Sequence, residues 1–451
     1  MPPTAMPPMT AETAGAAAHP GPSLGFWAAT ALVVGNMIGS GLFLLPSALA
    51  GYGGVAALGF ALSAVGAVLL ALVFARLGLR HPRSGGPYAY ARLAFGDATG
   101  FAVAWSYWVS NWCGNAAIAV AFAGYFGALV PGSTATPMRA AALAVAALWL
   151  CTVFNLRGVR SAGVMQLVLT AAKLLPLAAI IALGAWSVDA ANWHPFNRSA
   201  GGLLSATTAT AALTLWAFLG LECATIPAAE VRDPQRTIPR ATVVGTAIAI
   251  VVTVGACMIV VGVLPASALA LSAAPFVDAA ARLWGGPAGM LFGAAAALSC
   301  IGALNGWVLM QGQLPLAVAR DGLFPAAFAR CDARGTPWLG LVISSVLSSV
   351  LVVANYQRSL IGMFTFAILL STAATLLAYL VCSAAALRLR EGTGRNIAGM
   401  LVALGALAFS VWALVGTGVE SLLWGLVLIL LGAPLYLWQR RRQRHTFLPV
   451  M

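Results

Sequence analysis

Residues 33–46, VVGNMIGSGLFLLP, carry three glycines, an asparagine and a serine inside an otherwise apolar run. Glycine is about 1 kcal/mol less favourable than alanine in a helix, so the GSG triplet predicts an interruption there. Backbone N–H and C=O groups freed by the interruption are tolerated at membrane depth only where they line a cavity or bind a ligand. We therefore predict a broken helix beside a binding site. Close packing of two helices through small residues is the alternative.

The composition is that of a membrane protein. Hydrophobic residues make up 61% of the 451 residues and charged residues only 8%, and the mean hydropathy is +0.93, whereas soluble domains carry about 25% charged residues. Ten-residue segments of alternating polarity, typical of transmembrane β-barrels, are absent from the sequence. The predicted fold class is therefore an all-α polytopic membrane protein.

Apolar stretches of about 20 residues, the length that crosses a bilayer, recur along the chain. We predict twelve spans, at 24–49, 54–79, 98–130, 138–156, 162–186, 203–228, 240–265, 286–317, 337–355, 359–388, 397–416 and 420–438. Residues 24–438 then form a single transmembrane domain. Residues 1–23 lack Lys and Arg and are expected to be a disordered tail rather than a signal peptide, and residues 439–451 a basic tail.

The arginines predict the orientation. If the N-terminus is cytoplasmic, nineteen arginines lie in inner loops and tails, and only Arg139, Arg198, Arg282 and Arg358 lie outside. Cytoplasmic loops carry the excess of basic residues in membrane proteins, so both termini are expected in the cytoplasm. The net charge of +13 then reflects this topology, and no nucleic-acid partner is expected.

A second interruption is predicted in the sixth span, at Gly220 in the sequence AFLGLE. Two interrupted helices at corresponding positions of two halves are typical of inverted-repeat transporters with a site at the bilayer midplane. We predict repeats over residues 24–186 and 203–388, with the last two helices, 397–438, outside them.

Two ionisable residues lie deep in the predicted spans. Glu222 follows the Gly220 interruption, and a buried acid costs a few kcal/mol on insertion, which makes it a candidate for taking up and releasing a proton. Anchoring of the unwound backbone is the alternative. Lys173, the only lysine, could place a cation where other proteins bind Na⁺; the alternative is that its side chain extends to the inner surface.

Aromatic and polar residues surround the predicted interruptions. Trp216 lies one helical turn before Gly220, and Trp307 is flanked by small residues in GALNGWVL. Aromatic rings hold cations by contacts of about 2 kcal/mol when desolvated, which favours a positive or planar head group. One polar stripe with helical spacing occurs in the third span, at Tyr107, Ser110, Asn111 and Asn115. Helix–helix hydrogen bonding is the alternative role for each member.

Other functional classes lack their motifs. The sequence has no GxxxxGK[ST] loop for an ATP-driven pump, no HExxH or paired CxxC for a metal site, and no TVGYG filter. The seven cysteines fall mostly in apolar spans and are expected to be core residues. We expect no cofactor, no metal and no enzymatic activity. A membrane enzyme would need a second catalytic side chain near Glu222, and the sequence offers none.

Four segments together resemble the amino acid, polyamine and organocation (APC) transporter superfamily, over residues 24–438. They are GNMIGSGLFLLP, HPRSGGPYAYARLAFG, WAFLGLECATIPAAEVRDPQRTIPRA and ARDGLFPAAFARCDARGTPW. Within the superfamily they are most similar to bacterial arginine:agmatine antiporters and their relatives for lysine, ornithine and polyamines. The resemblance implies a bacterial inner-membrane protein with a five-plus-five inverted repeat and two extra helices, often a homodimer.

The resemblance also implies the site. The α-amino and carboxylate groups of the substrate would rest on the unwound segment at Asn36, Met37, Ile38, Ser40 and Gly41. Contacts with the rest of the substrate would come from Ser110, Asn111, Asn115, Trp216, Leu219, Trp307 and Ser371. Trp216 would close over the bound side chain, Tyr107 would help to gate it, and Glu222 would sense acid.

Two departures bear on the substrate. Ser110 and Asn111 stand where arginine:agmatine antiporters have smaller or less polar residues, and Lys173 resembles the lysine that replaces sodium in proton-dependent or exchanging permeases. We expect alternating-access exchange of arginine or a related cationic small molecule, driven by the partner gradient or by protons. The alternative is a proton-coupled permease or exporter for neutral amino acids. A membrane enzyme or channel is the alternative from another class.

Overall fold

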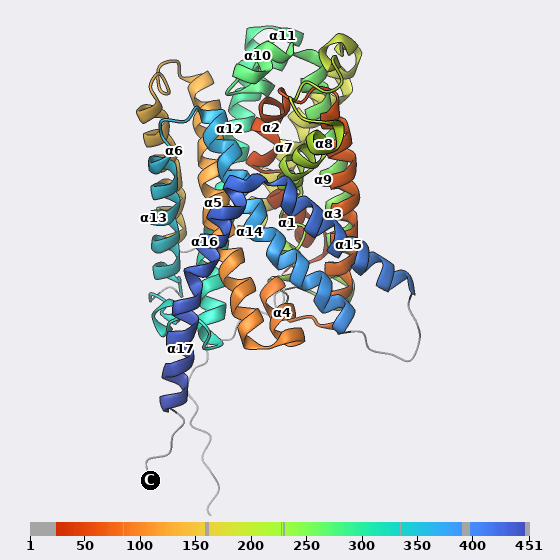
Figure 1. The fold of residues 1–451 in the computed structure, drawn as a ribbon. Coiled ribbons are helices and arrows are strands. Elements are labelled where there is room, and N and C mark those ends of the chain that lie inside the picture. Colours follow the sequence, from red (N-terminus) through yellow and green to blue (C-terminus); the bar gives the residue numbers. More distant parts are fainter. Residues whose placement is uncertain are drawn as a thin grey trace, which may run out of the picture.

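The computed structural model describes residues 24–83, 85–157, 162–226, 228, 231–333, 335–389 and 397–446, and within them the side chains of residues 40, 41, 162–169, 172 and 442–446 are excluded. The ordered elements in these ranges are helices, and the β pairing among them is one isolated bridge between Leu24 and Val231. Figure 1 shows the helices gathered in one bundle. The predicted all-α polytopic fold is confirmed. The expected disordered tail, 1–23, lies outside the described residues.

The principal helices follow the predicted spans closely. Their bounds are α1 Phe26–Met37, α2 Ser40–Leu49, α3 Val55–Arg80, α4 Pro87–Phe95, α5 Asp97–Leu129, α6 Pro137–Leu156, α7 Ala162–Gly184, α8 Leu203–Leu215, α9 Pro234–Val263, α10 Ala266–Leu271, α11 Pro275–Trp284, α12 Gly286–Arg320, α13 Trp338–Ala354, α14 Leu360–Arg388, α15 Ile397–Gly416, α16 Gly418–Leu430 and α17 Gly432–Thr446. Because α17 continues through Thr446, the first part of the predicted basic tail is helical.

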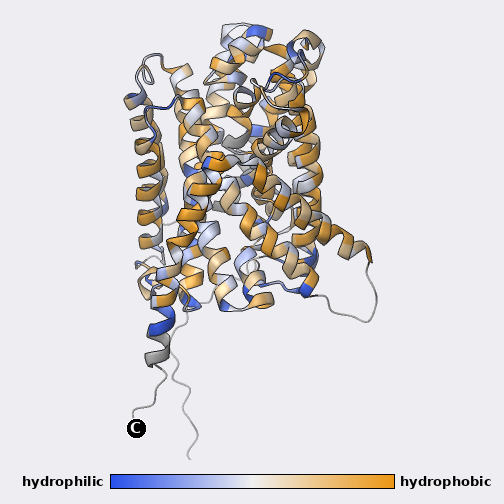
Figure 2. Cartoon of the chain, in the orientation of Figure 1, coloured by the Kyte–Doolittle hydropathy of each residue, from blue (hydrophilic) through white to orange (hydrophobic). Residues whose placement is uncertain are grey.

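Within the described part of the chain, nine helical stretches are long and apolar enough to cross a bilayer: Phe26–Leu49, Val55–Arg80, Asp97–Leu129, Pro137–Leu156, Pro234–Val263, Gly286–Arg320, Leu360–Arg388, Ile397–Gly416 and Gly418–Arg441. Three shorter apolar helices fall in the remaining predicted spans, at Lys173–Ser187, Leu203–Phe218 and Trp338–Ala354. Figure 2 shows hydrophobic residues along these helices and hydrophilic ones concentrated toward their ends. The count of twelve crossings stays a prediction.

The first predicted interruption is confirmed, and it is short. Helix α1 ends at Met37, Ile38 and Gly39 leave helical geometry, and α2 begins at Ser40. Ser40 and Gly41 therefore lie in the first turn of α2 rather than in the unwound segment, which corrects their predicted placement. The first N–H groups of a helix lack intrahelical acceptors, so the main chain there still offers donors.

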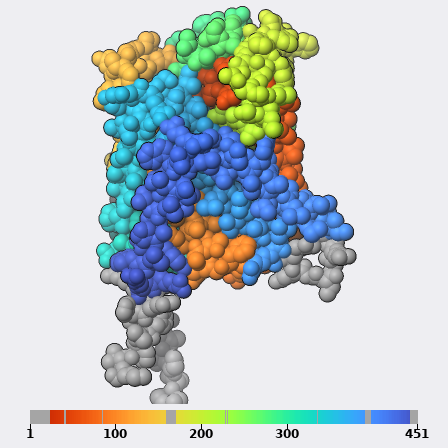
Figure 3. All heavy atoms as spheres, viewed as in Figure 1, coloured from red at the N-terminus to blue at the C-terminus, as the bar shows by residue number. Residues whose placement is uncertain are grey.

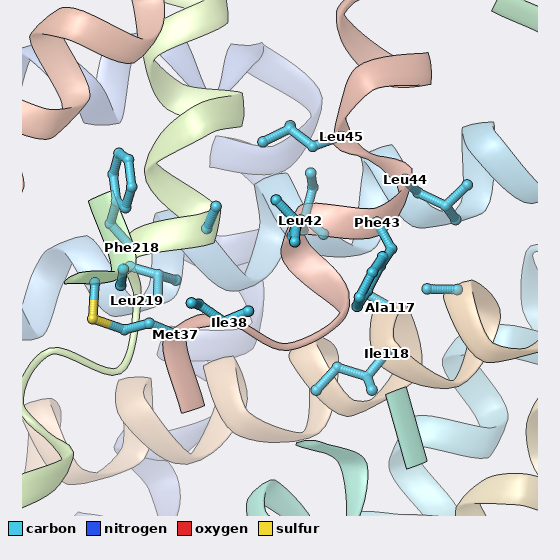
Figure 4. Packing of buried hydrophobic residues seen from close by; sticks show 14 of the residues in the cluster. Met37, Ile38, Leu42, Phe43, Leu44, Leu45, Ala117, Ile118, Phe218 and Leu219 are labelled. Atoms are coloured by element: carbon cyan, nitrogen blue, oxygen red, sulfur yellow. The ribbon is translucent and has the colours of Figure 1, made fainter. Parts of the chain in front are cut away.

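The second interruption, at Gly220, is also confirmed. Helix α8 ends at Leu215, a 3-10 turn follows at Trp216–Phe218, Leu219 is extended, and Gly220 has a φ of +102°. A Cβ atom at Gly220 would lie 3.3 Å from the Cβ of Asn36 and 3.3 Å from the Trp307 ring. The two interruptions therefore abut, and in Figure 4 Leu219 and Phe218 lie beside Met37 and Ile38.

Helix α5 packs against both α12 and α14 at the centre, and α1 packs against α7 and α9. Helices α15 to α17 lie at the periphery (Figure 3): only 22% of the apolar window in Ile397–Gly416 and 17% of that in Gly418–Arg441 are buried, compared with 88% for Phe26–Leu49. The assignment of the last two helices, 397–438, to a place outside the two repeats stays a prediction. Six of the seven cysteines are buried core residues, and Cys331 is half-buried.

The short helix α4 lies in the loop between two predicted spans and is held by polar contacts. Arg92 pairs with Asp97 at 2.7 Å and with Asp321 at 3.0 Å, and the Tyr88 hydroxyl donates to Asp321 over 2.8 Å. Burial, and then the hydrogen bond to Asp321, raise the pKa of Tyr88 above its ordinary value. The hydroxyl therefore stays protonated and keeps donating, which ties α4 to the end of α12.

Candidate functional site

A cavity lies where the two interrupted helices meet α5, α12 and α14. The cavity volume is about 30 Å³, so the space is narrow in this conformation. Its lining residues are Asn36, Met37, Gly39, Tyr107, Ser110, Asn111, Gly114, Ile118, Trp216, Leu219, Glu222, Trp307, Ser371 and Thr375. Residues from five segments far apart in sequence thus converge on one site.

Three lining side chains present buried polar atoms without a hydrogen-bond partner among the described residues. They are Oδ1 of Asn36, Nδ2 of Asn111 and Nε1 of Trp216. A buried polar group without a partner costs about 1–3 kcal/mol, so native proteins rarely leave several together without a reason. One acceptor and two donors facing the same space are what a polar ligand would satisfy.

Glu222 is fully buried and lines the cavity, and two tyrosine hydroxyls donate to its carboxylate. Tyr107 donates to Oε1, and Tyr379 donates to Oε2 over 2.5 Å. The side chain therefore joins α5 and α14 to the second interruption. Tyr107 was predicted near this site, whereas Tyr379 was not. Glu222 is the only acidic or basic residue among those that line the cavity.

The polar stripe on α5 divides between the cavity and helix contacts. Tyr107, Ser110 and Asn111 line the cavity, but Ser110 also hydrogen-bonds to Ser371 at 2.9 Å and to Thr375. Asn115 is not among the lining residues. Its Nδ2 donates to Oε1 of Gln311 over 2.6 Å. In this conformation Asn115 therefore has the alternative role given for the stripe, a hydrogen bond between two helices.

Lys173 does not line the cavity, and its Nζ does not extend to the surface. The residue is 4% exposed, and Nζ donates to the carbonyl oxygen of Gly35 over 2.7 Å. Gly35 precedes the cavity residue Asn36 by one position, so Lys173 donates to the backbone next to the first interruption without lining the cavity itself.

The other predicted site residues fall into two groups. Met37, Trp216, Leu219, Trp307 and Ser371 line the cavity, and Trp307 Nε1 donates to the Asn36 carbonyl oxygen over 3.4 Å. Ile38 is buried and is not among the lining residues, because it packs in the hydrophobic cluster around the interruption.

The prediction missed four lining residues: Gly39, Gly114, Ile118 and Thr375. Gly114 has a clear packing role, since a Cβ atom there would lie 2.8 Å from the ring of Trp216. Helical spacing could have found Ile118 and Thr375, because Ile118 follows Asn111 by seven positions and Thr375 follows Ser371 by four. No three His, Cys, Asp or Glu residues in the described ranges cluster as metal ligands would.

Comparison with known proteins places this architecture in a family. The family described as "Amino acid permease" matches residues 24–436. The cadaverine/lysine antiporter of Escherichia coli K12 is 34% identical over 334 residues, which cover 73% of this chain and 74% of the antiporter. The putrescine transporter PotE of the same strain is 30% identical over 90% of this chain and 94% of its own length.

A third relative is a Bacillus subtilis protein provisionally named an arginine/ornithine antiporter. It is 32% identical over 436 residues, which cover 88% of this chain and 92% of the relative. These relatives are transport proteins by name, and the family match over residues 24–436 includes both interrupted helices and the residues of the cavity between them. This chain therefore belongs to the amino acid permease family of the APC superfamily, and it is a multi-pass membrane transporter of amino acids or amines rather than an enzyme.

Proposed function

We propose that this protein exchanges a cationic amino acid for the amine that forms when such an amino acid loses its carboxylate. Arginine and agmatine are the pair predicted from the sequence. The relatives extend the candidates, by their names, to lysine with cadaverine, to arginine with ornithine and to putrescine. The proposal places the protein in a bacterial inner membrane with both termini in the cytoplasm.

One observation carries the proposal: among the described residues, the cavity lining combines two tryptophans with one acidic residue, Glu222, and includes no lysine, arginine or histidine. Aromatic faces and a carboxylate favour a positive ligand, and a nearby lysine or arginine would oppose one. A zwitterionic end would be held at the α1–α2 interruption, where Asn36 Oδ1 accepts from the ammonium group and the first N–H groups of α2 donate to the carboxylate. An amine without a carboxylate would keep the remaining contacts.

We further propose roles for the individual residues. Asn36, Met37, Ser110, Asn111, Trp216, Leu219, Trp307 and Ser371 contact the substrate directly. Trp216 closes over the side chain, Tyr107 gates, and Glu222 senses protons. Lys173 takes the place of a sodium ion behind the first interruption.

Exchange in proteoliposomes tests the proposal. Vesicles loaded with unlabelled arginine, lysine, ornithine, agmatine, cadaverine or putrescine should take up labelled arginine faster than empty vesicles do. External cationic compounds should compete, and leucine and methionine should not. Competition by leucine or methionine as strong as that of every cationic compound would overturn the proposal in favour of a neutral amino acid permease.

A further inference from the structure

Behind the α5 wall of the cavity, four polar side chains from four helices form one hydrogen-bonded chain. Asn115 of α5 donates from Nδ2 to Oε1 of Gln311 on α12 over 2.6 Å, and Nε2 of Gln311 donates to Oγ of Ser345 on α13 over 2.9 Å. The Ser345 hydroxyl lies 2.7 Å from Oγ1 of Thr152 on α6. All four residues are buried. We call this set the amide relay.

Backbone carbonyls determine the direction of every bond in the amide relay. Thr152 Oγ1 lies 2.8 Å from the carbonyl oxygen of Leu148. A carbonyl oxygen can only accept, so the Thr152 hydroxyl donates its one hydrogen to it. Thr152 must then accept from Ser345, and Ser345 must accept from Gln311. The carbonyl oxygen of Leu341, 3.4 Å from Nε2 of Gln311, requires the same orientation of the Gln311 amide. Gln311 therefore presents Oε1, an acceptor, to Asn115.

The consequence falls on Asn115. Gln311 presents an acceptor, so Asn115 must direct its amide nitrogen, Nδ2, toward Gln311. The side-chain oxygen of Asn115, Oδ1, then points away from the relay. Asn115 is 0% exposed, and Oδ1 has no hydrogen-bond partner among the described residues. An amide oxygen only accepts, so an N–H or O–H donor is what would satisfy it.

The position of Asn115 indicates where that donor comes from. Asn111 and Ile118, one turn away on either side along α5, line the cavity, and Gln311 lies one turn beyond the cavity residue Trp307 on α12. The pair of amides therefore sits at the boundary between the cavity and the helix packing behind it. Ammonium and guanidinium groups carry only donors, which is the complement of an unpartnered oxygen.

We propose that Gln311 is a positioning residue for substrate selectivity. By holding the Asn115 amide nitrogen, it keeps the Asn115 oxygen free to accept an N–H from the positive head group of the substrate. The inference rests on the proposed function, because it assumes that a cationic substrate enters this cavity. Without Gln311, the Asn115 amide could rotate and present a donor instead, which a cation cannot use.

Gln311→Met removes both polar groups of the relay at this position while keeping an unbranched side chain of similar length. The assay uses labelled arginine or lysine, whichever the wild type exchanges, with norvaline or norleucine as the matching chain without its cation. Hydrogen bonds to charged groups are strong enough that we expect the KM of the cationic substrate to rise about tenfold or more. The neutral compound has no N–H group at that end of its side chain, so its weak inhibition, read at high concentration, should change less than about twofold.

Four further variants separate positioning from general packing. Gln311→Glu keeps an acceptor facing Asn115, so it should retain the preference for the cation. Asn115→Leu should lose that preference, and the double variant with Gln311→Met should lose no more than Asn115→Leu alone, because both act through one oxygen. Ser348→Ala, on α13 but outside the relay, removes hydroxyl bonds to Trp112 and Ser344 and should leave selectivity unchanged.

The outcomes distinguish the two proposals. A wild-type protein that fails to prefer cationic over neutral compounds refutes the proposed function, and this inference with it. A wild-type preference that survives Gln311→Met, or an equal loss in Gln311→Glu and Gln311→Met, refutes the inference alone. If Gln311→Met does not yield a monodisperse protein, the comparison of Asn115→Leu with Gln311→Glu decides, since the inference requires that Asn115→Leu lose the preference for the cation and that Gln311→Glu retain it.

Discussion

Lys173 on α7 donates from Nζ to the carbonyl oxygen of Gly35, 2.7 Å away, at the last turn of α1 before its interruption. The carbonyl groups at the end of α1 have no continuing helix to satisfy them, because α2 begins only at Ser40. A buried ammonium group supplies both a donor and a positive charge at that point. The contact therefore joins the fifth predicted span to the residue that precedes Asn36, which lines the cavity.

Lys173→Ala should reduce exchange about tenfold or more, since a hydrogen bond from a charged donor is worth about 1.5–3 kcal/mol. Transport that becomes dependent on sodium would support the same role, with the ion replacing the ammonium group. Thr170→Val is the matched control, because Thr170 also contacts the α1 backbone, at the Ala31 carbonyl oxygen over 3.4 Å. Uptake by Lys173→Ala at the wild-type rate in sodium-free buffer would remove Lys173 from the mechanism.

Glu222→Gln should flatten the pH dependence of exchange, measured in proteoliposomes from about pH 5 to pH 8, the range in which proton-coupled sites operate. Glutamine can still hydrogen-bond with Tyr107 and Tyr379, but it cannot take up or release a proton. Tyr379→Phe is the control, because it removes one donor to the carboxylate and keeps the titratable group. That variant should remain pH-dependent. An unchanged profile in Glu222→Gln would contradict proton sensing by this residue.

Trp216→Ala and Trp307→Ala should each abolish measurable uptake while the protein stays folded. A desolvated cation–aromatic contact of about 2 kcal/mol corresponds to a loss of about thirtyfold, before any loss of side-chain closure is counted. Trp424→Ala is the control, since Trp424 is 53% exposed on the peripheral helix α16. Size-exclusion chromatography verifies folding. Normal uptake by both cavity variants would reject binding of the substrate between the two rings.

Gly220→Ala should lower both thermal stability and transport. The φ of +102° at Gly220 is unfavourable for a residue with a Cβ atom, and such strain costs about 1–3 kcal/mol. The added Cβ atom would also crowd Asn36 and Trp307 at 3.3 Å. Gly202→Ala, before α8, is the matched control, because its φ is −65° and no heavy atom lies within 4 Å of an added Cβ. An equal melting temperature for both variants would show that the interruption tolerates a side chain.

Sequence patterns were sufficient to predict the class of the fold and its two interruptions. Hydropathy and glycine content act locally, since a bilayer rejects unpaired backbone groups and glycine weakens the helix wherever it stands. The predictions at the GSG triplet and at Gly220 therefore agree with the structure to within a residue or two. Tryptophans and the acid beside those interruptions, Trp216, Trp307 and Glu222, also line the cavity as expected.

Hydrogen-bond partners were beyond the reach of such patterns. Helical spacing placed Ser110 and Asn115 on one face of α5, but it could not show that Ser110 bonds to Ser371 or that Asn115 bonds to Gln311, 196 positions away. Helical spacing also gave no indication that Tyr379 donates the second hydrogen bond to the carboxylate of Glu222.

Local patterns in the chain were therefore enough to predict a bundle of membrane helices, two of them broken, with a few polar residues at the breaks. Which of those residues face the cavity, and which are held by a neighbouring helix, depends on how the helices pack. The backbone conformation of a segment depends on residues that are adjacent in the chain. Which atom of a buried amide stays without a hydrogen-bond partner depends instead on the distant side chain that packs against that amide.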